Sequence, residues 1–123
     1  SEVLFIAEKI KEYQNSGYKS IAIICKAEEE ALIINKKLSD YGINARNVTP
    51  NDREYHGGLC TITCSLAKGL EFDASILASV DSKMYNQSCD IDMKLLYVGM
   101  TRALHETTVI STCELPSIFK KSG

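Results

Sequence analysis

The feature that most constrains the fold is the run SIAIIC (20–25), in which apolar residues occupy every position after the serine. A strand with one face in water alternates apolar and polar residues, so this run predicts a strand that is covered on both faces. FDASILASV (72–80) is interpreted in the same way. Three further segments have strand character, namely NARNV (44–48), LCTITC (59–64) and ETTVIST (106–112).

Helical patterns separate these strands. EVLFIAEKIKEYQNSG (2–17) and KAEEEALIINKKLSDYG (26–42) repeat apolar residues at helical spacing, and DMKLLYVGMTRALH (92–105) predicts a third helix. Strands that alternate with helices indicate an α/β fold. We expect a single domain over residues 1–123, with three α/β/α layers and a mostly parallel central sheet.

Composition excludes several classes of protein. Hydrophobic residues make up 45% of the 123 positions, so a packed core is expected rather than disorder. No apolar run approaches the roughly 18 residues of a membrane span, and no basic-then-apolar leader is visible, so a cytoplasmic location is expected. The five cysteines are an odd number and lie mostly inside apolar runs, which indicates reduced thiols and predicts no metal site.

The charge balance limits the way in which this chain could bind nucleic acid. Fourteen basic residues stand against sixteen acidic ones, for a net charge of −2. A domain that binds nucleic acid alone usually carries a clear basic excess. Any contact with nucleic acid is therefore expected to be local, or shared with another domain.

The expected architecture also predicts where the chemistry lies. Ligands of open α/β sheets bind at the carboxyl ends of the strands. That rule directs attention to Lys26 after one strand, to Ser65 and Lys68 after another, and to the helix that holds Arg102.

AKGLEFD (67–73) places a lysine–glycine pair directly before an acidic residue. A P-loop requires G-x-x-x-x-G-K-[ST], but Lys68 precedes Gly69 and Leu70 stands where serine or threonine is needed. The segment is therefore not a P-loop. Gly69 is expected to permit a tight turn, and Glu71 to accept hydrogen bonds from a hydroxylated ligand.

YVGMTRALHE (97–106) is interpreted as part of a helix. At 100° per residue, Arg102 lies beside the buried face of this helix. Its side chain is therefore expected to be partly packed, so that its guanidinium has a restricted orientation. Such an arginine suits a phosphate held across a domain boundary. Gly99 costs a helix roughly 1 kcal/mol relative to alanine, which indicates close packing against a strand or a ligand.

Taken in order, IAIICKAEEEA, TITCSLAKGLEFDASIL and MKLLYVGMTRALHETTV resemble motifs IV, V and VI of superfamily 1 helicases of the UvrD/Rep type. The resemblance covers residues 20–112 and implies the second RecA-like domain of a helicase, a P-loop NTPase-type domain without the P-loop. It also implies ATP with Mg²⁺ at a site shared with an N-terminal RecA-like domain of the same protein, and single-stranded DNA as a partner. The metal and most phosphate contacts would belong to that other domain, so the isolated fragment is expected to be inactive.

The resemblance assigns roles to individual residues. Arg102 matches the arginine finger, which contacts the γ-phosphate and is the one catalytic residue expected here. The remaining assignments are ATP binding by Lys26, Gly69 and Glu71, and coupling to DNA by Thr63, Ser65 and Lys68.

Two positions depart from the family pattern. Cys25 and Lys26 stand where the family typically has a tyrosine that stacks on adenine and an arginine. Cysteine cannot stack, and lysine lacks the two-pronged geometry of a guanidinium. Ser65 stands where motif V commonly has histidine, which affects the expected DNA contacts.

The sequence leaves three alternative functions open. The loop TPNDREYHGG (49–58) replaces the accessory domain that many relatives insert, as in the compact branch that includes the HelD proteins. An alternative to a DNA helicase or translocase is therefore an ATP-driven remodeller that acts on RNA polymerase. The third is a non-catalytic α/β module that binds a ligand or a protein.

Overall fold

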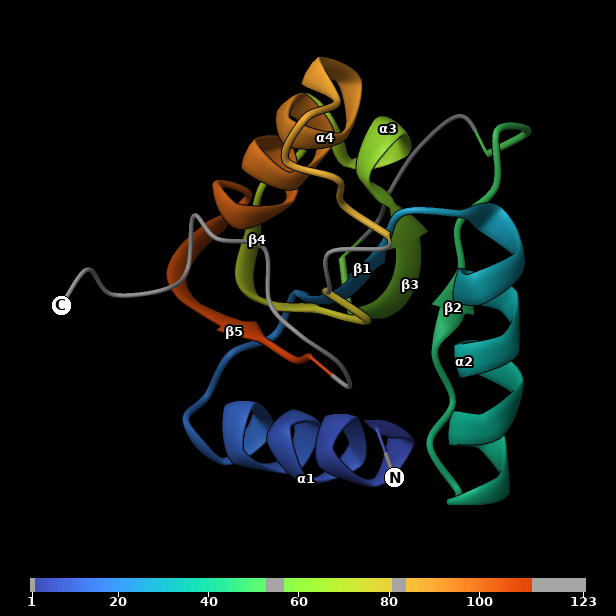
Figure 1. Cartoon of the computed structure of the whole chain (residues 1–123). Coiled ribbons are helices and arrows are strands. Elements are labelled where there is room, and N and C mark those ends of the chain that lie inside the picture. Colours follow the sequence, from blue (N-terminus) through green and yellow to red (C-terminus); the bar gives the residue numbers. More distant parts are fainter. Residues whose placement is uncertain (1, 53–56, 81–83, 112–123) are drawn as a thin grey trace, which may run out of the picture.

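The computed structural model describes residues 2–52, 57–80 and 84–111 (Figure 1). Five strands and four helices follow one another in these segments. In chain order they are α1 (Glu2–Asn15), β1 (Ile21–Cys25), α2 (Glu28–Asp40), β2 (Arg46–Asn47), β3 (Leu59–Thr63), α3 (Cys64–Ala67), β4 (Phe72–Leu77), α4 (Asp90–Met100) and β5 (Ala103–Val109).

The strands form one sheet in the order β2-β3-β1-β4-β5, and every pair in it is parallel. β1 is the central strand, because Ile21 pairs with Leu59 of β3 on one side and with Ala74 of β4 on the other. All five residues of β1 are buried, as the run SIAIIC predicts.

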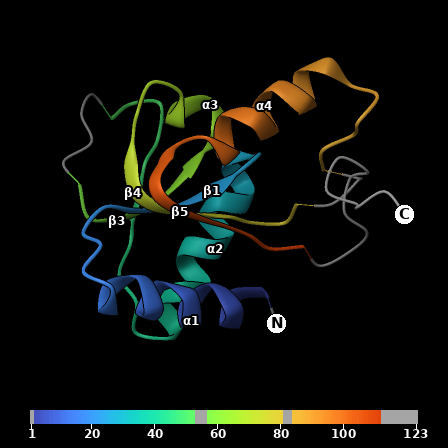
Figure 2. The same cartoon turned by 90° about the vertical axis from the view of Figure 1, so that its left-hand side faces the viewer.

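Helices cover both faces of the sheet (Figures 1 and 2). Ile21, Ile23 and Cys25 of β1 pack in a core with α1 and α2, whereas Ala22 and Ile24 pack in a second core with α3 and α4. Successive side chains of a strand point to opposite faces, so one apolar run serves both cores. The predicted three-layer α/β/α architecture with a parallel sheet is confirmed.

The predicted boundaries near the C-terminal end of the fold are wrong. The third predicted helix runs to residue 105, but α4 ends at Met100 and β5 already begins at Ala103. The Thr101 hydroxyl donates to the carbonyl of Tyr97 and the backbone turns out of the helix there. Pairing of β5 with β4 begins at once, since Phe72 pairs with Ala103.

Two other expectations concern the connections. The turn expected after LCTITC contains the short helix α3, and the Thr63 hydroxyl at its start accepts a hydrogen bond from the backbone N–H of Leu66. The loop 49–58 includes residues 53–56, which lie outside the described part of the chain. Its proposed replacement of an accessory domain therefore stays a prediction.

Gly99 provides the close helix–strand approach expected from the sequence. A Cβ atom at this position would lie 2.5 Å from Cδ1 of Leu77 and 3.4 Å from Sγ of Cys64. Leu77 is fully buried in the core, so it has little room to move away. The missing side chain therefore lets α4 lie directly on the sheet.

Candidate functional site

Glu71 and Arg102 lie together at the amino edge of the sheet. Glu71 directly precedes β4, Arg102 directly precedes β5, and these two parallel strands are neighbours. The backbone N–H of Phe72 donates to the carbonyl of Arg102 at 3.0 Å, which joins the two segments at the positions where the strands begin.

This placement corrects the expected location of the site. The carboxyl-end rule directs attention to the helix that holds Arg102, and for Arg102 this expectation is wrong, because the residue directly precedes β5. The segment that contains α3 carries the chain back to the start of β4, and α4 carries it back to the start of β5. Glu71 and Arg102 therefore each follow a segment that carries the chain back across the sheet to the amino end of the next strand. Because Arg102 was expected inside a helix that ended at residue 105, the second crossing could not be located from sequence.

The Arg102 side chain is held by the end of α4. Its Nε donates to the carbonyl of Val98 at 3.1 Å, and its Nη2 donates to the Thr101 hydroxyl at 3.1 Å. A cation is stabilised at the C-terminus of a helix, where unpaired carbonyl groups carry partial negative charge. No carboxylate of the described residues lies within ion-pair distance of this guanidinium. Its remaining N–H groups can therefore bind an anion.

The turn before β4 is open to solvent. Lys68, Gly69 and Glu71 are all exposed. Gly69 has a φ of 86°, and no atom lies within 4 Å of the position of a Cβ there, so glycine is needed for the backbone conformation and not for space. Glu71 therefore presents a carboxylate at the edge where Arg102 presents a guanidinium.

Thr63 and Ser65 lie near the opposite edge. Thr63 is the last residue of β3 and is 5% exposed, and its hydroxyl caps α3. Ser65 is exposed on α3, and Lys68 is the residue that ends this helix. The eight-residue stretch from Cys64 to Glu71 thus links the carboxyl end of β3 to the amino end of β4.

Lys26 is not brought to Glu71 and Arg102. Its Nζ lies 2.6 Å from Oδ1 of Asp92, donates to the carbonyl of Met84 at 2.5 Å, and sits 5.8 Å from the centre of the Tyr85 ring. The hydrogen bond from Lys26 is the main reason that the pKa of the Asp92 carboxyl lies below its usual range. Asp92 belongs to the first turn of α4 and Arg102 follows its last turn, so a helix of roughly 16 Å separates the two groups.

Cys25 is fully buried in the core that lies against α1 and α2, and burial raises the pKa of its thiol well above the usual value. It faces Glu30 and not the amino edge. Neither Cys25 nor Lys26 is thus available beside Glu71 and Arg102 to contact a nucleotide bound there.

A polar cluster at the carboxyl ends of β1 and β4 was missed by sequence reasoning. The Ser79 backbone N–H and hydroxyl donate to the two carboxylate oxygens of Glu2 at 2.9 and 2.7 Å. Glu30 of α2 lies beside Ser79 and Cys25, and burial raises the pKa of its carboxyl. The helices that follow β1 and β4 cover opposite faces of the sheet, so this is the crevice where ligands of such folds usually bind. The only sequence signal is the acidic first turn of α2.

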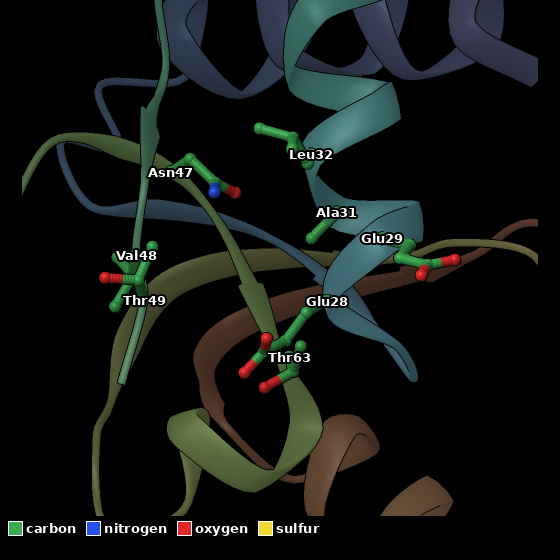
Figure 3. A pocket seen from close by; sticks show the side chains of 8 residues that line it. All are labelled: Glu28, Glu29, Ala31, Leu32, Asn47, Val48, Thr49 and Thr63. Carbon is green, nitrogen blue, oxygen red and sulfur yellow. The ribbon is translucent and has the colours of Figure 1, made fainter. Parts of the chain in front are cut away.

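A cavity of about 220 Å³ opens between α2 and the strands β2 and β3 (Figure 3). Thr63 contributes to it, and Figure 3 shows its side chain beside that of Glu28. Apolar side chains of α2 and the end of β2 complete the walls. The full lining is Glu28, Glu29, Ala31, Leu32, Asn47, Val48, Thr49 and Thr63.

Within residues 2–52, 57–80 and 84–111 there is no group of three or more histidine, cysteine or acidic side chains that could hold a metal ion. No helix in those same segments is long and apolar enough to cross a membrane.

Comparisons with known proteins agree with the fold. The family profile described as UvrD-like helicase C-terminal domain matches residues 58–110, which include both AKGLEFD and YVGMTRA. A similar solved structure is the C-terminal domain of a possible DNA helicase from Lactobacillus plantarum WCFS1, with 25% sequence identity and a TM-score of 0.80. The alignment covers 96% of this chain and 71% of that one. Among proteins with curated descriptions, none matches.

The all-parallel sheet with helices on both faces is an α/β fold consistent with the RecA-like C-terminal domain of a helicase. The resemblance to UvrD-like helicases is supported: residues 58–110 match the profile of the UvrD-like helicase C-terminal domain, and the fold is similar to the C-terminal domain of a possible DNA helicase.

Proposed function

We propose that this domain forms one wall of an ATP site whose other wall is an N-terminal RecA-like domain of the same protein, in an ATP-dependent DNA helicase or translocase. The observation that carries the proposal is the pair Glu71 and Arg102, which adjoin at an exposed edge without a charged partner among the described residues. Two opposite charges that the fold leaves unpaired suit a ligand with both phosphates and hydroxyls.

Arg102 is the proposed arginine finger. Val98 and Thr101 orient its guanidinium through Nε and one Nη, which reduces the freedom that must be lost when a phosphate binds. The remaining N–H groups would stabilise negative charge that builds up on the transferred phosphoryl oxygens.

Glu71 is the proposed acceptor for the ribose hydroxyls of the nucleotide. Glu71 is exposed and lies two residues after Gly69. The positive φ of Gly69 permits a tight turn at this point of the chain. Bound ATP would supply the γ-phosphoryl group, which water accepts as ADP leaves. The described residues hold no acidic cluster for Mg²⁺, so the metal and most phosphate contacts are assigned to the other domain.

Thr63, Ser65 and Lys68 are proposed to couple this site to single-stranded DNA. They lie on β3 and α3, and the same continuous segment leads on to Gly69 and Glu71. A shift of the 68–71 turn on nucleotide binding would therefore move α3 directly. Lys26 is instead assigned to the fold, because Asp92 and Met84 already bind its ammonium group.

Turnover of the full-length protein tests the finger role. Arg102→Ala should lower the ATPase rate about 10³-fold. Arg46→Ala is the matched control, since Arg46 pairs with Asp52 on the exposed edge strand β2 and should leave the rate unchanged. A loss of less than tenfold for Arg102→Ala would remove the assignment.

The alternative is an ATP-driven remodeller of RNA polymerase. The three glutamates at the start of α2 favour it, because an acidic surface at the carboxyl edge repels the DNA backbone. ATPase activity that single-stranded DNA does not stimulate, together with co-purification of RNA polymerase, would support this alternative. Stimulation by DNA would support the helicase or translocase.

A further inference from the structure

The side chain of Asp73 joins the start of β4 to the start of β1. Its Oδ2 accepts hydrogen bonds from the backbone N–H groups of Lys19 and Ser20 at 2.9 and 3.1 Å. The backbone N–H of Asp73 in turn donates to the Ser20 hydroxyl at 2.8 Å. The N–H of Ser20, followed by that of Lys19, is the main reason that the pKa of the Asp73 carboxyl lies below its usual range. These three hydrogen bonds are called the Asp73 clamp below.

The Asp73 clamp lies where the regular pairing of β4 is incomplete. The register between β1 and β4 begins only at Ala74, which pairs with Ile21. On the other side of β4, the register with β5 shifts between Phe72 and Ala74. The clamp therefore extends the attachment of β4 to β1 by one residue in the direction of Glu71.

Glu71 and Arg102 are held at the amino edge in different ways. The guanidinium of Arg102 is bound through its own atoms by Val98 and Thr101. The carboxylate of Glu71 makes no hydrogen bond or ion pair with any residue of the described segments. The position of Glu71 therefore depends on how firmly the neighbouring backbone is held.

We infer that Asp73 is a positioning residue for Glu71, and through Glu71 for the sugar hydroxyls of a bound nucleoside triphosphate. Both residues that follow Glu71 are anchored, Phe72 by complete burial of its side chain and Asp73 by its clamp. A carboxylate on an anchored backbone loses less freedom when a hydroxyl group binds to it. The inference rests on the proposed function and deepens it, because it names the contact by which the amino edge would distinguish nucleotides with sugar hydroxyls from those without.

ATPase kinetics of the full-length protein with ATP and with 2′,3′-dideoxy-ATP test the inference. The dideoxy analogue lacks both ribose hydroxyls, so its KM in the wild type should be about tenfold higher, as for the loss of a hydrogen bond to a charged group. Asp73→Ala should raise the KM for ATP about tenfold and so remove the difference between the two nucleotides. It should change kcat less than about threefold, because Arg102 keeps its own contacts.

Two milder variants separate the clamp from a general loss of structure, and they keep the test valid if Asp73→Ala does not fold. Both backbone donors bind the single atom Oδ2, so Asp73→Asn keeps an acceptor and should retain most of the preference for ATP. Ser20→Ala removes only the third bond and should raise the KM for ATP about two- to threefold. Glu71→Ala/Asp73→Ala should be no worse than Glu71→Ala alone, because Asp73 acts through Glu71.

Asp52→Ala is the matched control. Asp52 also accepts a backbone N–H, that of Thr49 at 2.6 Å, and it pairs with Arg46 at 2.8 Å near the edge strand β2. Its loss should leave kcat and the KM values of both nucleotides unchanged. Urea denaturation of each variant checks that the fold is retained under the assay conditions.

Failure of this inference and failure of the proposed function are distinguishable. If Glu71→Ala loses the preference for ATP while a folded Asp73→Ala keeps it, the inference is overturned and the role of Glu71 stands. An unchanged KM for ATP in Ser20→Ala, together with equal losses in Asp73→Asn and Asp73→Ala, would also overturn the inference. If Glu71→Ala itself keeps the preference, Glu71 does not bind the ribose, and both the proposed role of Glu71 and the inference are wrong.

Discussion

Lys26 and Glu2 at one edge of the sheet differ in their partners from Glu71 and Arg102 at the other. At the carboxyl edge, Lys26 is paired with Asp92, and both carboxylate oxygens of Glu2 accept hydrogen bonds from Ser79. At the amino edge, Glu71 and Arg102 have no ion-pair partner among the residues that the structure describes.

This difference is the reason that we propose a nucleotide site at the amino edge and not at the location given by the usual rule for α/β sheets. The rule places ligands at the carboxyl ends, in the crevice where the helices leave to opposite faces. In this domain Ser79 binds both carboxylate oxygens of Glu2 in that crevice, and Oε1 of Glu30 is the buried side-chain oxygen of the described residues that has no hydrogen-bond partner. The amino edge is left with charged groups that a second domain and a shared ligand could pair.

The largest expected difference between variants at the two edges is in the ATPase rate. Arg102→Ala should lower the ATPase rate of the full-length protein about 10³-fold, or about 4 kcal/mol in the activation free energy. Lys26→Met, at the other end of α4, should change the rate of the folded protein by less than tenfold. Equal losses for the two variants would show that the carboxyl edge also takes part in the chemistry, and the comparison would fail.

The free energy of unfolding should show the opposite ranking, with Lys26→Met destabilised more than Arg102→Ala. Lys26→Met removes the ammonium group that pairs with Asp92 and donates to the carbonyl of Met84, which should lower the free energy of unfolding by roughly 1.5–3 kcal/mol. Arg102→Ala removes hydrogen bonds of a partly exposed side chain and should cost less. Urea denaturation of the domain measures both, and the double variant Lys26→Met/Asp92→Asn should recover part of the loss if the pair is the cause.

Gly99 connects the two edges, because it sets the approach of α4 to the sheet. Gly99→Ala should destabilise the domain by about 1–2 kcal/mol, since the clash with Leu77 outweighs the roughly 1 kcal/mol gain in helix propensity. The combination Gly99→Ala/Leu77→Ala makes room for the new methyl group. Additive losses in that double variant would contradict the contact with Leu77 as the cause.

The smallest expected effect is on pH dependence at the carboxyl edge. Burial raises the pKa of Glu30 in the folded state above its unfolded value. The folded state therefore loses stability as pH rises from the unfolded pKa through the folded one, because ionising Glu30 costs more when it is buried. Glu30→Gln should stabilise the domain at pH 8 relative to wild type and much less at pH 4, as measured by urea titrations at both pH values.

Local patterns were enough for a large part of the fold. SIAIIC required a strand buried on both faces, and that strand proved to be the central one. Gly99 was expected at a close packing contact, and it lies against Leu77. These inferences succeeded because burial on both faces and a missing side chain leave their mark within a few neighbouring residues.

Contacts between distant segments could not be obtained in this way. The pairing of Lys26 with Asp92 depends on where α4 begins relative to the end of β1, and Asp92 appears in sequence only as a charge in a first helical turn. The end of α4 at Met100 was missed for the same reason. YVGMTRALH continues a helical pattern, but the exposed edge of β4 makes pairing from Ala103 onward more favourable.

The sequence by itself determined the class of fold and the helicase resemblance, because buried runs and the segments AKGLEFD and YVGMTRA are properties of consecutive residues. Only the tertiary structure decided that Glu71 and Arg102 meet at the amino edge while Lys26 is bound by Asp92 at the other. The physical reason is that strand order and the return crossings of α3 and α4 decide which strand ends lie side by side. That arrangement is set by packing across the whole sheet and not by any local pattern.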